Sequence, residues 1–259
     1  MPIVIRTPVQ DGAGATATAT SRTPGRPGGS VSGDLLLLSM AWSGSTVTLT
    51  DPTGWTPLHK TQQTNANLAV YARASDGTAT DTPTLTVSAA CTCVGTCSGF
   101  GSWDGVLPVA GTTAINTLSG SASTTIIYGG ITPQTAGDLL IYITGLRPST
   151  ASTQVTAVAP AGGTGGTVTK QIDGCTNVSG SAEEETAVIT QQLSAATAVT
   201  QQNATVATAV SGNIETIVIT PATVAASKPQ RVRRNIQGNP GAIPSQHMTT
   251  ELTGARYGR

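Results

Sequence analysis

The chain has 259 residues, which is enough for one large all-β domain or two small ones. Charged residues make up only 10% of it, and thirteen basic residues balance thirteen acidic ones, so little self-repulsion opposes the association of copies. The many Thr and Val residues argue against long helices, because β-branched side chains lose rotamer freedom against a helical turn.

Residues 1–32 are predicted to form an N-terminal strand and a loop rich in Gly, Pro and Thr. The apolar run Ile3-Val4-Ile5 is too short for a signal peptide, and Leu35-Leu36-Leu37-Leu38 is too short to cross a bilayer. The sequence therefore predicts synthesis in a cytoplasm and no membrane partner.

Short predicted strands and turns follow from residue 33 onward. Leu35 to Trp42 and Ile214 to Ile219 are predicted to be buried strands, whereas Thr84 to Val87 alternates between hydroxyl and apolar side chains. Turn sequences such as Asp51-Pro52-Thr53-Gly54 and Asp76-Gly77 separate them. This spacing is typical of a jelly-roll-like antiparallel β-sandwich.

A repeated pattern divides this region into two halves. Gly33-Asp34-Leu35-Leu36 returns as Gly137-Asp138-Leu139-Leu140, and Ala69-Val70-Tyr71 is matched by Ala187-Val188-Ile189. The order of the matches is kept, which predicts an internal duplication. The halves form either the two sheets of one large sandwich or two packed small ones, and the lack of a distinct linker favours one sandwich. The predicted sandwich covers residues 33–222, with halves at about 33–110 and 124–222.

The segment from Glu183 to Val210 is ambiguous, because its Ala and Gln content permits a helix. Its match to the first half instead predicts two strands joined near Ser194-Ala195-Ala196. We favour the strands.

Residues 223–259 have the composition of an extended arm, with three prolines from Pro229 onward and almost no apolar periodicity. One acidic residue, Glu251, accompanies six basic ones, which leaves seven basic and twelve acidic residues for the rest of the chain. This contrast predicts that the arm docks on a neighbouring protein or on a copy of the chain, and nucleic acid is not the expected partner. The basic residues of the arm are Lys228, Arg231, Arg233, Arg234, Arg256 and Arg259.

The sharpest local signal is a cluster of thiols. A four-cysteine zinc site and disulfides are alternatives, but the spacing is not that of two Cys-x-x-Cys knuckles, and cytoplasmic synthesis argues against early oxidation. Free thiols are the preferred interpretation, and no metal or cofactor is expected. The cysteines are Cys91, Cys93, Cys97 and Cys175.

No catalytic constellation is visible, and we expect no enzymatic activity. A triad would need His59, expected on a strand near the surface, or His247 in the arm. Asp34 and Asp138 would suit glycoside hydrolysis if they faced each other, but an Asp at a tight turn more often accepts backbone amides. Glu183-Glu184-Glu185 is predicted to be a solvated loop.

Three tryptophans are the largest side chains of the chain. Trp42 and Trp103 are candidate glycan contacts if they form a stacking platform. The alternative places Trp55 and Trp103 in the core, and the scarcity of other large side chains favours this second interpretation.

Four runs of the first half together resemble a β-sandwich module common in structural proteins of tailed bacteriophages. They are Gly33 to Leu38, Pro52 to Leu58, Leu68 to Ala74 and Gly101-Ser102-Trp103. The resemblance covers about residues 30–222, is looser in the second half, and brings no catalytic residues.

The resemblance implies a virion structural protein of the minor tail, baseplate or fibre type, made in the host cytoplasm. Its partners would be copies of itself and other virion proteins, with the C-terminal arm holding it to its neighbours. Two alternatives stay open at this point. One is a capsid decoration protein that stabilises the head, and the other is a carbohydrate-binding adhesin that attaches to a host surface glycan.

Overall fold

The computed structural model describes residues 2–63, 66–108, 114–132, 135–148, 166–176, 183–196, 198–199 and 202–223. Over these residues the chain forms antiparallel β-strands and one 3-10 turn, η1 (Ala79–Asp81), which confirms the predicted all-β sandwich. The described part contains no helix that could span a membrane. Residues 1–224 cluster as one compact unit, and the predicted arm from residue 224 onward lies outside the described residues.

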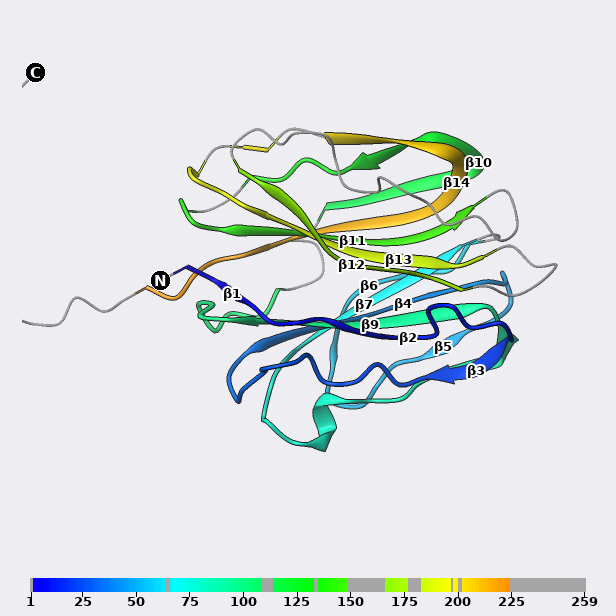
Figure 1. The fold of residues 1–259 in the computed structure, drawn as a ribbon, viewed down its shortest axis with the longest axis horizontal. Coiled ribbons are helices and arrows are strands. Elements are labelled where there is room, and N and C mark those ends of the chain that lie inside the picture. The colour runs from blue at the N-terminus through cyan, green and yellow to red at the C-terminus, as the bar shows by residue number, and fades with distance from the viewer. Residues whose placement is uncertain are drawn as a thin grey trace, which may run out of the picture. The chain divides into compact units, whose positions relative to one another are not determined.

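The first half forms two sheets. The larger has the strand order β1 (Val4–Ile5), β9 (Cys93–Gly101), β4 (Leu35–Trp42), β7 (Asn67–Ala74) and β6 (Thr56–Thr61), with β2 (Val9–Asp11) also paired to β9. The smaller has the order β3 (Ala19–Arg22), β8 (Leu85–Cys91) and β5 (Leu49–Thr50). Figure 1 shows the two layers stacked in the lower part of the view.

The second half forms one sheet that curls over itself. Its order is β10 (Ala114–Tyr128), β14 (Gln202–Ile219), β11 (Leu139–Pro148), β13 (Glu185–Gln192) and β12 (Val168–Cys175). β10 and β14 are long and bend over the other strands in the upper part of Figure 1. The strands predicted on either side of Ser194-Ala195-Ala196 are confirmed as β13 and β14.

The two halves follow the same plan strand by strand. Leu38 of β4 pairs with Tyr71 of β7, as Tyr142 of β11 pairs with Ile189 of β13. β2 and β3 together correspond to β10, and β8 and β9 together correspond to β14. The predicted internal duplication is therefore confirmed. Its halves begin earlier than the sequence suggested, because the strands before residue 33 belong to the first half.

The outer strands β6 and β12 carry a bulge at equivalent places. The register shifts between Pro57 and His59 in β6, and between Lys170 and Ile172 in β12. A bulge in an edge strand twists it away from flat pairing with another sheet. The two halves therefore share the strand order and also a bulged edge strand that discourages pairing with another sheet.

Three apolar clusters hold the unit together. One lies between the two sheets of the first half and includes Leu36 and Trp42, and another lies inside the curled sheet of the second half. The third joins Leu35 and Leu37 of β4 to Ile141 of β11, between the halves. The fold therefore combines both predicted arrangements: the main sheets face each other, and each half also closes a core of its own. This explains why every residue of β4 is buried.

The ends of the two halves also pair with each other. Trp103 and Pro221 form an antiparallel bridge. The Asp104 amide donates to the carbonyl of Thr220 at 2.9 Å, and the Ala222 amide donates to the carbonyl of Ser102 at 2.8 Å. The halves are thus joined by backbone hydrogen bonds as well as by the third cluster.

Candidate functional site

The predicted aspartate pair occupies equivalent turns in the two halves. The carboxylate of Asp34 accepts the Val31 amide at 2.9 Å, and that of Asp138 accepts the Thr135 amide at 3.0 Å. The preceding glycines, Gly33 and Gly137, have φ values of 89° and 93°, which suit glycine because it has no Cβ. Both aspartates therefore belong to separate turns, and the idea that they face each other across a hydrolytic cleft is wrong.

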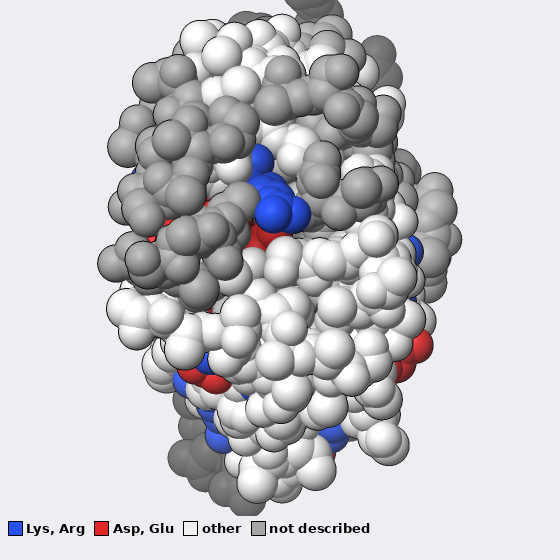
Figure 2. Space-filling view, turned by 90° about the vertical axis from the view of Figure 1, so that its right-hand side faces the viewer, with Lys and Arg blue, Asp and Glu red and all other residues white. Residues whose placement is uncertain are grey.

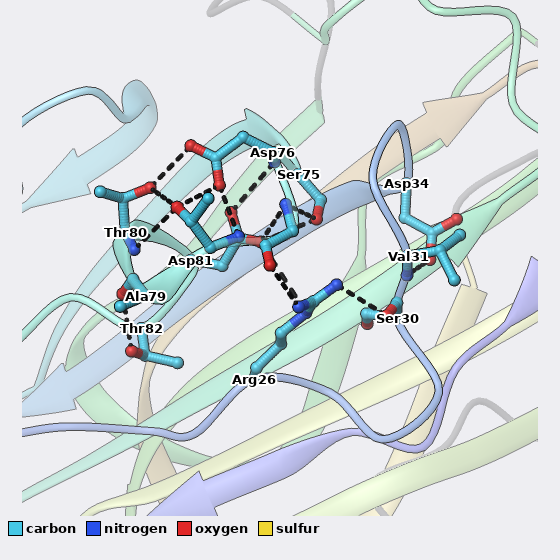
Figure 3. A network of polar contacts seen from close by, with 12 residues as sticks. Arg26, Ser30, Val31, Asp34, Ser75, Asp76, Ala79, Thr80, Asp81 and Thr82 are labelled. Atoms are coloured by element: carbon cyan, nitrogen blue, oxygen red, sulfur yellow. Dashed lines mark hydrogen bonds and ion pairs between the residues drawn. The ribbon is translucent and has the colours of Figure 1, made fainter.

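The turn at Asp34 is tied to the rest of the first half. Arg6 makes a two-point contact with its carboxylate, at 2.8 Å from Nε and 3.0 Å from Nη2. A second buried carboxylate, Asp81, lies beside Arg26, whose Nη2 donates to the Ser30 carbonyl at 2.7 Å (Figure 3). These polar side chains fasten loops to one another, which is a structural role.

All three tryptophans are buried. Trp42 is 0% exposed, Trp55 6% and Trp103 8%. The Trp42 indole donates to the Val47 carbonyl at 2.8 Å, and the Trp103 indole donates to the Gly33 carbonyl at 2.7 Å. The core interpretation is confirmed. The prediction that Trp42 or Trp103 offers a stacking face to a glycan is wrong.

The three consecutive glutamates are also buried, so the prediction of a solvated loop is wrong. Glu183, Glu184 and Glu185 are each 0% exposed. Thr176 donates its hydroxyl to Glu183 at 2.8 Å, and Arg147 lies 4.0 Å from Glu184. Burial raises the pKa of Glu184 well above its usual value, although the charge of Arg147 acts in the opposite direction. Three consecutive acids suggest an exposed loop, but strand β13 begins at Glu185, and the side chains on both of its faces are buried.

The acidic character of the body is largely internal. Seven of the twelve acidic residues outside the arm are buried. Three of the others form ion pairs: Asp51 with Lys60, Asp76 with Arg73 and Asp173 with Lys170. Figure 2 shows one face on which uncharged side chains cover most of the described surface. The buried acids are Asp34, Asp81, Asp138, Glu183, Glu184, Glu185 and Glu215.

This distribution leaves few exposed acids on the described body for the arm of a neighbouring copy to contact. The basic residues of the arm, from Lys228 to Arg259, lie outside the described residues. Their role in holding a neighbour stays a prediction.

The four cysteines do not assemble into one site. Cys91 and Cys93 flank Thr92 at the corner between β8 and β9, Cys97 lies further along β9, and Cys175 lies on β12. All four are free thiols, and the described residues contain no group of three or more His, Cys, Asp or Glu side chains that could hold a metal. The structure thus gives no support to a four-cysteine zinc site.

His59 lies on strand β6, as predicted, but it is buried rather than near the surface. Burial lowers its pKa to about 4, so the imidazole is neutral at neutral pH. Its Nε2 is hydrogen-bonded to the hydroxyl of Thr61, not to a nucleophile and a carboxylate. His247 lies outside the described residues.

Comparisons with protein-family models, with curated proteins and with solved structures found no match for this chain. The candidate sites must therefore be judged on their geometry. The described residues place the aspartates in turns, the tryptophans and glutamates in buried positions, and Cys91, Cys93 and Cys97 in the apolar core of the first half.

Proposed function

We propose that this chain is a structural protein of a tailed-bacteriophage virion, of the minor tail, baseplate or fibre type. The observation that supports this most is how the motif residues are used. Asp34 closes a turn, and Trp55 and Trp103 fill the core, so the motifs serve to build a sandwich rather than to perform chemistry. This matches the role that the family resemblance implies for them.

The surface and the duplication are consistent with such a role. The described body has few exposed charges, and several of them form ion pairs. Such a surface suits a protein whose faces are covered by other subunits, because little repulsion opposes close approach. The bulged edges β6 and β12 discourage uncontrolled strand pairing between copies. Assembly would then rely on side-chain contacts and on the arm.

The number of copies per purified particle tests the proposal. Quantitative mass spectrometry against the major capsid protein should give a low ratio, from three to a few tens of copies per particle, if the chain belongs to the tail; this range is a rough expectation from point-group assemblies. A ratio of hundreds would instead favour the capsid decoration protein. Absence from particles would overturn the virion proposal in both forms.

The arm is tested separately. We expect that a chain ending at residue 227 folds, because residues 1–224 contain all three apolar clusters, but does not join particles. The matched control keeps the full length and replaces Arg231, Arg233 and Arg234 with Gln. Loss of incorporation in both variants would assign attachment to the basic cluster, whereas normal incorporation of the truncated chain would show that the arm is not the attachment.

A further inference from the structure

Four aspartates of the chain are followed directly by glycine, a sequence in which the backbone can attack the side chain. The attacking atom is the amide nitrogen of the glycine, and glycine favours this reaction because it has no Cβ and adopts more backbone conformations than other residues. The four pairs have the same local chemistry, but the structure gives them different surroundings. They are Asp11-Gly12, Asp76-Gly77, Asp104-Gly105 and Asp173-Gly174.

Two of the four pairs are held in strands. Asp11 ends β2 and pairs with Gly95, and its carboxylate accepts the Thr23 amide at 2.6 Å. Asp173 lies within β12, where its side chain is 8% exposed and forms an ion pair with Lys170. Attack on the side chain requires the extended backbone to bend into a small ring, so strand pairing opposes the reaction at both places.

The other two pairs begin turns of the same kind. In each turn Oδ1 of the aspartate accepts a hydrogen bond from the amide two residues further on, which is Thr78 for Asp76 at 2.8 Å and Val106 for Asp104 at 2.9 Å. The two glycines have φ values of 79° and 84°, in the left-handed region. The turns are therefore matched, and they differ in what else the carboxylate and the glycine amide contact.

The turn at Asp76 is restrained at both reacting groups. Thr80 donates its hydroxyl to Oδ2 of Asp76 at 2.7 Å (Figure 3), and Arg73 forms an ion pair with the same oxygen. The Gly77 amide donates to the carboxylate of Asp81 at 3.1 Å. These contacts must break before the Gly77 nitrogen can attack, and they protect this pair.

The turn at Asp104 lacks these restraints. Asp104 and Gly105 are exposed, and within the described residues the Asp104 carboxylate has no partner other than the Val106 amide. No described group accepts a hydrogen bond from the Gly105 amide, and no atom beyond its chain neighbours lies within 4 Å of the place of a Cβ on Gly105. The hydrogen bond from Val106 closes a ring that contains Cγ of Asp104 and the Gly105 nitrogen, so it keeps the two reacting atoms close together.

We propose that Asp104-Gly105 is a modification site at which aspartate isomerises spontaneously to isoaspartate. The Gly105 nitrogen attacks Cγ of Asp104 and loses its proton, one carboxyl oxygen leaves as water, and a cyclic imide forms. Water then opens the ring at one of its two carbonyl groups. Breaking the bond from nitrogen to Cγ restores aspartate, whereas breaking the bond from nitrogen to the main-chain carbonyl carbon gives isoaspartate. The reaction needs no co-reactant besides water.

The product changes the loop and leaves the junction of the halves in place. The main chain then runs through Cβ and Cγ of residue 104, so the turn hydrogen bond from the Val106 amide is lost. The Asp104 amide, which donates to the Thr220 carbonyl at 2.9 Å, lies before the altered bond and keeps its partner. The modified chain is therefore expected to stay folded.

The test incubates the full-length chain at neutral pH in water enriched in heavy oxygen. Each ring opening leaves one heavy oxygen in the residue, and mass spectrometry with peptide fragmentation locates it. We expect Asp104 to gain heavy oxygen at least about 10-fold faster than Asp76, because one hydrogen bond to a charged group accounts for about that factor. In the chain unfolded by guanidinium, all four pairs should react at similar rates, since the contacts that distinguish them are gone.

Two variants test the geometry. Thr80→Ala removes a donor from the Asp76 carboxylate and leaves the turn at Asp104 intact, so it should raise the rate at Asp76 several-fold. Asp104→Glu keeps the charge but lengthens the side chain, which requires a larger ring, and labelling at residue 104 should stop. The circular dichroism spectrum of each variant checks that it folds.

The proposal is overturned if Asp104 gains heavy oxygen no faster than Asp76 in the folded chain, or if the unfolded chain is labelled and the folded chain is not. An unchanged rate at Asp76 in Thr80→Ala would remove the contrast on which the site is assigned. Labelling of the same peptide that persists in Asp104→Glu would place the reaction elsewhere. The inference concerns the body of the chain and does not depend on whether the protein belongs to a virion.

Discussion

Asp34 and Asp138 each accept a backbone amide inside a buried turn, so removing either carboxylate leaves polar groups without partners. Asp138 also accepts the Thr135 hydroxyl at 2.6 Å, and Asp34 balances the charge of Arg6. Leaving a buried donor without an acceptor costs more free energy than the intact hydrogen bond contributes to stability.

We expect Asp138→Ala to lower the free energy of unfolding by about 1–3 kcal/mol, with a similar or larger loss for Asp34→Ala, because each leaves buried donors unsatisfied. Urea denaturation measures both. The control is Asp104→Ala, an exposed residue whose substitution should stay within about 0.5 kcal/mol of the wild type. If Asp138→Ala lowers the free energy of unfolding no more than this control does, the hydrogen bonds of the turn do not stabilise the fold.

Glu184 predicts a dependence of stability on pH. Neither of its carboxylate oxygens accepts a hydrogen bond within the described residues, and its surroundings are Arg147, Glu183 and Cys93. Because burial raises its folded pKa above the ordinary 4.5, the neutral acid stabilises the fold at low pH. That contribution is lost as the pH rises from the unfolded value through the folded one, by about 1.4 kcal/mol per pH unit at most.

Glu184→Gln should remove this loss. We expect the melting temperature of the variant to equal that of the wild type below the ordinary carboxyl pKa of 4.5, and to exceed it increasingly as the pH rises above 4.5 toward the raised folded pKa. A difference that stays constant over this range would mean that Glu184 keeps its charge in the folded state, through Arg147.

At the level of elements, the strands and turns could be predicted from residue pattern, and the cores only in part. Leu35 to Trp42 is apolar throughout because it faces two clusters, and the sequence shows this directly. The burial of Glu183 to Glu185 could not be predicted, because it depends on strand partners distant in the chain.

Gly212 marks the place where β14 bends as β8 and β9 do. Its φ is 152°, and a Cβ there would lie 2.1 Å from the Gly145 carbonyl oxygen and 2.9 Å from Leu146 Cα, both backbone atoms that cannot move aside cheaply. We expect Gly212→Ala to destabilise the fold by roughly 3 kcal/mol or more, as a backbone clash in a buried strand.

The control for this clash is Gly25→Ala, whose Cβ would meet only Val9 at an ordinary 3.8 Å. Thermal unfolding of the two variants compares them directly. Equal melting temperatures would contradict the close approach of β14 and β11 at Gly212.

At the level of the whole molecule, the third cluster makes the halves dependent on each other. Leu35 and Leu37 of the first half pack with Ile141 and Ile217 of the second, so neither half can unfold without exposing apolar surface on the other. One unfolding transition is expected for the described unit.

All three tryptophans belong to the first half, so their fluorescence reports the unfolding of that half alone. A destabilising change in the second half therefore tests whether the two halves unfold together. Ile189→Ala removes a buried side chain from the core inside the second half and should cost about 2–5 kcal/mol. We expect tryptophan fluorescence and far-ultraviolet circular dichroism to shift together to lower denaturant. An unshifted fluorescence transition would show that the halves unfold independently.

The bridge between Trp103 and Pro221 has a consequence for the order of the chain. Val4 pairs with Gly101, and Ala222 is hydrogen-bonded to Ser102, so the path into the sandwich and the path out of it run beside the same strand end (Figure 1). A circular permutant can therefore join residue 223 to residue 4 through a short linker and open the chain between its halves. In such a rearranged chain the duplicated units exchange places along the sequence while every strand keeps its neighbours.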